Sequence, residues 1–242
     1  MRQIFTFVLA ALSLFGWTSA ARANFEVRPA IIEIEESNGR FESQFEIVNP
    51  REKPIAIEIA VKQRVFLPDG GEELVAADDD FLIFPLQTAL APGERQLVRI
   101  SYLDPSLESS RSFRLIVGEV LAPLEASSAN AATIRTRFEF NPSLHVIPKG
   151  AEARLAIENV RIENGADGKN FLRLDVVNSG NRYAYLSDKE IVIGEYRLPP
   201  ERIIPVMAPR PVGPGNRMSL EFDIGTDVVQ VSEPATIRTF KP

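Results

Sequence analysis

A histidine and a serine are the first residues whose types and spacing could support chemistry. His145 is the only histidine in the chain, and Ser143 lies two residues before it, on the same face of a strand. A hydroxyl beside an imidazole is the arrangement of a nucleophile and its base. However, the chain contains no G-x-S-x-G nucleophile motif. We therefore expect His145 to face solvent, and we expect the protein not to be an enzyme.

The remaining polar motifs do not predict a metal or cofactor site. The chain has no cysteine and one histidine, which excludes thiolate sites and imidazole clusters. The acidic run Asp78-Asp79-Asp80 lacks the spaced ligands and turn glycine of a calcium loop, so we expect a solvated turn. Gly213-Pro214-Gly215 is a proline turn rather than a phosphate-binding loop. We expect no cofactor and no bound metal.

The charge balance argues against nucleic acid as a partner. The sequence has 27 Lys and Arg against 33 Asp and Glu, a formal net charge of -6. Nucleic-acid-binding domains usually carry a broad basic face, which this composition does not supply. We therefore expect no nucleic-acid partner.

The strongest pattern in the chain is a long alternation over residues 132–146. The even positions are mostly apolar and the odd positions are polar over about fifteen residues, although typical strands have about five or six. The candidate binding side chains on the mostly apolar face are Ile134, Thr136, Phe138, Phe140 and Leu144. One interpretation is a central strand whose apolar face lies in a core. The other is an edge strand that pairs with a second polypeptide, giving main-chain hydrogen bonds and alternate side-chain contacts.

The first 23 residues have the features of a cleaved secretory signal. Arg2 precedes an uncharged apolar run over residues 4–17, and Ala21-Arg22-Ala23 places small residues before Asn24. The apolar run is shorter than the roughly 20 residues that a membrane span needs. We expect a secreted mature chain without stable membrane insertion.

Strand-like alternation extends through most of the mature chain, with turn formers between the segments. Residues 55–61 alternate Ile and Val with other residues, and Pro68-Asp69-Gly70-Gly71 is a turn signal. Regular short strands predict an all-β protein with two immunoglobulin-like sandwiches. We place the domains at residues 24–148 and 149–242, on either side of Pro148-Lys149-Gly150. Residues 122–131 predict an exposed, mobile loop.

Several segments resemble one protein family. Residues 81–100, with Ala91-Pro92-Gly93 before Val98-Arg99, are similar to a family segment with a proline-glycine turn. Residues 25–49 resemble its opening strands, residues 112–121 its strand before a mobile loop, and residues 178–186 part of its second domain. The family is the periplasmic chaperones of the chaperone–usher pilus pathway, and the opening residues are more similar to its divergent, archaic branch.

This resemblance implies a fold, a location and partners. It implies two immunoglobulin-like domains in a boomerang, located in the periplasm. Residues 132–146 would be a donor strand that completes a pilin or fimbrial subunit, with Phe138 and Phe140 as the dominant contacts. The other expected partner is an outer-membrane usher. Self-association of the unliganded chaperone is left open.

The resemblance also implies a site for the subunit's terminal carboxylate. In the family, one basic residue on the first strand and another late in the donor strand hold this group. The corresponding positions here are Ile31 to Glu33 and Ser143, which are not basic. The nearby candidate anchors are Arg28, Arg137 and Lys149.

Two further residues match positions in the family. We expect Arg99 to support a strand and Glu119 to tie the two domains together. Both roles are structural.

The alternative function is a secreted two-domain binding module for carbohydrate or adhesion. Such a module would present exposed aromatic residues as a platform. The only tryptophan, Trp17, lies in the signal segment, and the chain has four tyrosines. This composition favours the chaperone interpretation.

Overall fold

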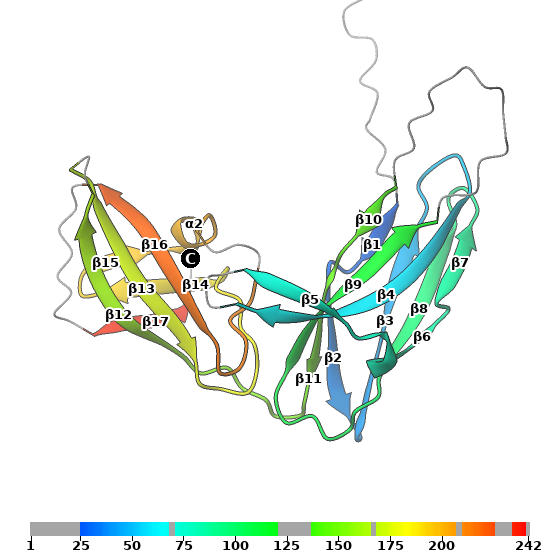
Figure 1. Cartoon of the computed structure of the whole chain (residues 1–242), viewed down its shortest axis with the longest axis horizontal. Helices are drawn as coiled ribbons and strands as arrows, with labels where there is room; N and C mark the ends of the chain where they lie inside the picture. Colours follow the sequence, from blue (N-terminus) through cyan, green and yellow to red (C-terminus); the bar gives the residue numbers. More distant parts are fainter. Residues whose placement is uncertain are drawn as a thin grey trace, which may run out of the picture.

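The computed structural model describes residues 25–67, 71–120, 137–165, 168–206, 210–225 and 234–240. They form two β-sandwich domains joined at an angle (Figure 1), which confirms the predicted fold class. The signal segment, the loop expected at 122–131, Ile134 and Thr136 lie outside these ranges.

The first domain is built from one curled sheet. Its order is β5-β4-β9-β11-β2-β3-β8-β6, and β1, β10 and β7 pair beside this path with β3, β9 and β4, respectively. The elements are β1 (Glu26–Arg28), β2 (Ile31–Ser37), β3 (Arg40–Val48), β4 (Ile55–Phe66), β5 (Glu72–Ala76), the 3-10 turn η2 (Asp78–Asp80), β6 (Phe81–Phe84), β7 (Gln87–Leu90), β8 (Arg95–Tyr102), β9 (Arg111–Glu119), β10 (Glu139–Phe140) and β11 (Ser143–Ile147).

Period-two alternation places apolar side chains of this sheet on one face. Ile55, Ile57 and Ile59 are buried, as are Phe113 and Leu115 on β9. Curling of the sheet brings these inward faces together in a single core. In the acidic turn η2, the carboxylate of Asp78 accepts a hydrogen bond from the Val61 amide at 2.8 Å.

The second domain contains two three-stranded sheets around a separate core. Their orders are β12-β13-β16 and β15-β14-β17. Buried side chains from both sheets, including Leu174, Ile191 and Leu220, form this core. The elements are β12 (Leu155–Asn164), β13 (Asn170–Asn178), β14 (Lys189–Ile193), β15 (Tyr196–Leu198), the short helix α2 (Pro200–Ile203), β16 (Arg217–Gly225) and β17 (Ala235–Thr239).

The domains meet at an elbow where β11 ends and the chain continues through residues 148–154 to β12. Ser110, immediately before β9, makes two hydrogen bonds across the elbow. Its amide donates to the Asn181 carbonyl at 2.8 Å, and its hydroxyl accepts from the Tyr183 amide at 2.8 Å. These bonds fix the start of β9 against the second domain.

Candidate functional site

One strand was expected over residues 132–146. In the described part of this range, from residue 137 onward, the chain forms two strands, β10 and β11. Asn141-Pro142 separates β10 from β11, because a proline cannot donate a ladder hydrogen bond. Both strands pair antiparallel with β9, with Phe140 opposite Val117 and Ser143 opposite Arg114. The prediction of one uninterrupted strand is therefore wrong between residues 140 and 143.

The two strands occupy different positions in the sheet. β11 lies between β9 and β2 and pairs parallel with β2, so it is a central strand. β10 pairs with β9 and has no second strand partner among the described residues. β11 is therefore a central strand, as one interpretation expected, whereas β10 lies at an edge among the described residues, and its pairing with a second polypeptide stays a prediction.

The apolar side chains follow this division. Phe140 is 41% exposed, and its ring lies 5.2 Å from that of the buried Phe25. Phe138 is partly buried and packs against the first core. Leu144 is fully buried within that core, because β11 has neighbours on both sides. Leu144 is thus a core residue and not an accessible binding residue.

The expectation that His145 faces solvent is wrong. Its side chain is fully buried at the elbow because the second domain covers the outer face of β11. Nδ1 lies 3.0 Å from the Ser112 hydroxyl, Nε2 lies 3.1 Å from the Tyr185 hydroxyl, and the ring stacks on Tyr183 at 3.8 Å. Burial, followed by the nearby arginine charges, lowers the pKa of His145 to about 3. The imidazole is therefore neutral near pH 7 and a weak base.

A compact basic group lies beside β11. Arg64 on β4 and Arg114 on β9 both contact Glu72 on β5, at 2.6 and 3.2 Å. Arg114 also donates to the hydroxyl of Ser143 at 3.2 Å, so Ser143 interacts with an arginine rather than with His145. One carboxylate thus serves two guanidinium groups, which leaves a local excess of positive charge.

Burial shifts the pKa values of Arg64 and Glu72. For Arg64, burial is the largest influence and lowers the pKa of the guanidinium. Burial raises the pKa of Glu72, but the hydrogen bonds and charges of Arg64 and Arg114 outweigh it and lower this pKa overall. Glu72 therefore remains ionised as the counter-charge of Arg64.

The three basic residues expected to hold a carboxylate do not form a shared site. Arg28 pairs with Glu26 next to it on β1, and Arg137 pairs with Glu58 at 2.6 Å. Lys149 is exposed in the segment between the domains. Arg64 and Arg114 were not predicted, because only strand pairing brings β4, β5 and β9 together.

Among the positions from Ile31 to Glu33, which correspond to the family's basic position on the first strand, Glu33 is acidic. Glu33 on β2 accepts a hydrogen bond from the Tyr183 hydroxyl and lies 3.4 Å from Arg182. Arg182 also contacts Glu35 at 3.0 Å. These interactions connect β2 to the second domain.

Glu119 does not tie the domains together. Its carboxylate pairs with Arg51 at 2.9 Å, and both residues belong to the first domain. Arg99 lies exposed on β8, where its backbone pairs with Gln44 of β3 and Phe84 of β6. The expectation for Glu119 is wrong, because the carboxyl end of β9 points away from the elbow.

A second exposed feature lies on the other side of the first domain. The edge strand β6 and its neighbourhood expose four large apolar side chains: Leu82, Phe84, Leu86 and Leu97. Leu82 and Phe84 are 63% and 74% exposed, respectively. We call these four residues the β6 patch.

The described residues show no group of three or more metal-ligating side chains suited to a metal ion. In the same residues, no helix has the length and apolarity needed to cross a membrane. The candidate functional features among these residues are the β10 edge, the β6 patch and the elbow.

No known family model and no curated protein matches the sequence. Solved structures do match the fold. The class 5 fimbriae chaperone CfaA has a TM-score of 0.56 at 13% identity, covering 90% of this chain and 100% of that chain. The SafB chaperone, solved with the SafA pilin of Salmonella enterica, has a TM-score of 0.53 at 15% identity, covering 83% and 84%.

The archaic CsuC–CsuE chaperone–tip subunit complex of Acinetobacter baumannii matches with a TM-score of 0.52 at 13% identity, covering 89% of this chain and 98% of that chain. The resemblance to pilus chaperones is thus confirmed at the level of the fold.

Proposed function

We propose that the mature chain is a periplasmic chaperone that captures pilus or fimbrial subunits on the free edge of β10 and delivers them to an outer-membrane usher. The observation that carries this proposal is the position of β10. It pairs on one side with β9 and carries the part-exposed Phe140, with the partly buried Phe138 just before it, within a fold shared with pilus chaperones.

The physical mechanism is strand addition. An extended segment of a subunit would form main-chain hydrogen bonds with the free edge of β10, and apolar side chains would enter the subunit's groove. Burial of a phenylalanine contributes about 1.5–3 kcal/mol. Phe140 is 41% exposed and can gain part of this contribution, whereas Leu144 is already buried and adds nothing to capture.

The β6 patch is a suitable surface for the usher. Its residues lie on β6, on β8 and, for Leu86, between β6 and β7; β6 and β8 are away from β10 in the sheet order, so a captured subunit would leave them uncovered. Exposed apolar side chains that gather on one face commonly mark protein-interaction surfaces, and Leu82 and Phe84 line the same hollow. The chaperone could then bind a subunit at β10 and the usher at the β6 patch at the same time, which delivery of the subunit to the usher requires.

Expression of the full chain would test the location. We expect the periplasmic protein to begin at Asn24, as measured by intact mass. Domain boundaries near residues 148–150 would be tested by limited proteolysis, and self-association of the free protein by light scattering.

Pull-down from a native periplasmic extract would test the partners, with mass spectrometry of the proteins that co-purify. We expect a small β-rich subunit with the wild type and its loss with Phe140→Glu. The matched control is Leu82→Glu, which introduces the same charge at an exposed apolar position of the β6 patch. We expect it to retain the subunit and to lose binding to purified usher. Subunit capture unchanged by Phe140→Glu would overturn the proposal and favour the alternative binding module.

A further inference from the structure

The sheet of the first domain has a gap in its side chains at Gly118 of β9. Gly118 follows the core residue Val117, so it lies on the face turned away from the core, and yet it is buried. Strand pairing places Glu58 of β4 and Glu139 of β10 opposite Gly118, one on each side. Residues directly opposite one another on paired strands share a face. The row across β4, β9 and β10 (Figure 1) therefore carries side chains at both ends and none in the middle.

The side chain of Arg137 occupies this gap. A Cβ atom at Gly118 would lie 2.7 Å from Nη2 of Arg137 and 3.5 Å from its guanidinium carbon, so the guanidinium lies directly over the glycine. Nη2 also donates to Oε1 of Glu58 at 2.6 Å. The arginine thus reaches from the residues just before β10, across β9, to β4. A side chain at residue 118 would compete for the same space.

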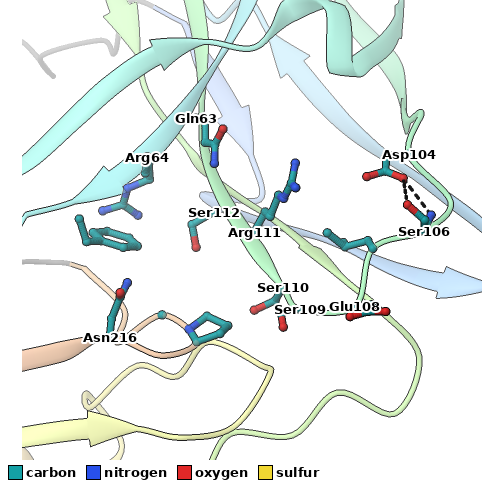
Figure 2. A pocket seen from close by; sticks show the side chains of 14 residues that line it. Gln63, Arg64, Asp104, Ser106, Glu108, Ser109, Ser110, Arg111, Ser112 and Asn216 are labelled. Carbon is teal, nitrogen blue, oxygen red and sulfur yellow. Dashed lines mark hydrogen bonds between the residues drawn. The ribbon is translucent and has the colours of Figure 1, made fainter.

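This ion pair is separate from the basic group at the elbow. Figure 2 shows Arg64 of β4 and Ser112 of β9 at the elbow end of the same two strands. The Arg64 side chain is buried there and bonds to Glu72. The side chains of Arg137 and Glu58 are 49% and 41% exposed, respectively. Their ion pair can therefore open and close in solvent without disturbing the core.

Few other contacts among the described residues hold the start of β10. The Glu119 amide donates to the Phe138 carbonyl at 3.0 Å, and Phe138 packs partly against the first core. At the other end of β10, the Pro142 carbonyl accepts a main-chain hydrogen bond from β9 at 3.1 Å, and the central strand β11 follows. The far end of β10 is thus fixed by β11, whereas its start depends on one main-chain bond, the packing of Phe138 and the arginine–glutamate pair.

We propose that Arg137 is a positioning residue for β10: by crossing Gly118 to reach Glu58, it latches the start of β10 to β4 and keeps the edge formed before a subunit arrives. Its role in capture rests on the proposed function, but the latch itself does not. A glycine at residue 118 leaves the room that the guanidinium needs. An edge that is ordered in advance avoids part of the ordering cost of binding. Subunit affinity should therefore fall in proportion to the fraction of molecules whose edge is not formed.

Hydrogen exchange of the mature chain, measured by NMR, tests the latch. The reporter is the Glu119 amide, because its hydrogen bond to Phe138 breaks when the start of β10 opens. We expect Glu58→Gln and Gly118→Ala each to speed its exchange about two- to fivefold, as for loss of an exposed ion pair, with little change in urea unfolding. The matched control is Glu46→Gln, which removes an exposed ion pair between β3 and β8 and should leave this exchange unchanged.

A double-mutant cycle tests whether the two side chains act through each other. Arg137→Gln combined with Glu58→Gln should speed exchange of the reporter amide no more than either single change. Additive effects in the double variant, or unchanged exchange in both Glu58→Gln and Gly118→Ala, would overturn the latch.

Subunit binding tests the role of the latch in capture. With the subunit recovered by pull-down, Gly118→Ala should bind about two- to fivefold more weakly than the wild type. Faster exchange with unchanged affinity would overturn the role in capture. A wild-type chain that captures no subunit would refute the proposed function instead, and the exchange measurements would still decide the latch.

Discussion

Acid should weaken the elbow through His145, and the size of the effect follows from its pKa. The folded value is about 3, against an ordinary value of 6.5. Between these values the unfolded chain binds a proton that the folded chain does not, so stability falls as the pH is lowered. Above pH 6.5 both states are neutral and the contribution is fully present. From pH 7.5 to 5.0, this single group should remove roughly 2 kcal/mol of unfolding free energy.

The measurement is urea unfolding of the wild type and His145→Gln at pH 7.5 and 5.0. Glutamine does not titrate, so the variant retains only the pH dependence of the other groups. We expect the wild type to lose about 2 kcal/mol more than the variant over this interval. Ser112→Ala is the control, because it removes one hydrogen bond and leaves the buried imidazole in place. Equal pH dependence in the wild type and His145→Gln would show that His145 does not titrate as a buried neutral group.

The remaining predictions concern packing and charge. Phe140→Glu should cost about 1–2 kcal/mol of unfolding free energy, because its side chain is 41% exposed but contacts the Phe25 ring, whereas Leu144→Ala should cost about 2–5 kcal/mol. Urea unfolding at pH 7.5 compares the two, and equal costs would contradict the division between edge and core. Glu72→Gln should cost about 3 kcal/mol because it leaves Arg64 buried without its counter-charge. Arg161→Gln should cost less than about 0.5 kcal/mol, and a similar loss in both variants would contradict this account.

Local alternation was sufficient to predict the strands and the class of fold. Ile55, Ile57 and Ile59 are buried as their spacing indicates. The break at Asn141-Pro142 is visible in the sequence, but the apolar positions keep the same parity on both sides. Alternation alone therefore indicates one strand where the structure has an edge strand followed by a central strand.

The environment of the polar face could not be predicted in the same way. His145 lies on the face opposite the first core, as its parity indicates, but the second domain covers that face. Arg64 and Glu72 are eight residues apart, and Arg114 joins them through β4–β9 pairing. Long-range strand pairing and domain docking determine these contacts. Neither can be inferred from the period-two alternation of apolar and polar residues within one segment.

The division between β10 and β11 has a consequence for capture. β11 is held by ladders on both sides and by the buried side chains of Leu144 and Val146, so it gives the edge a rigid base. Among the described residues, β10 has one ladder and a half-exposed Phe140, so under the proposed function its other edge would accept a further strand without loss of these main-chain bonds. The core side chains of β11 are already packed, so binding would not require this part of the chaperone to rearrange. The free energy gained from added strand contacts would then not be reduced by such a rearrangement. Under the proposed function, the central position of β11 beside β10 would favour capture of an extended segment by strand addition.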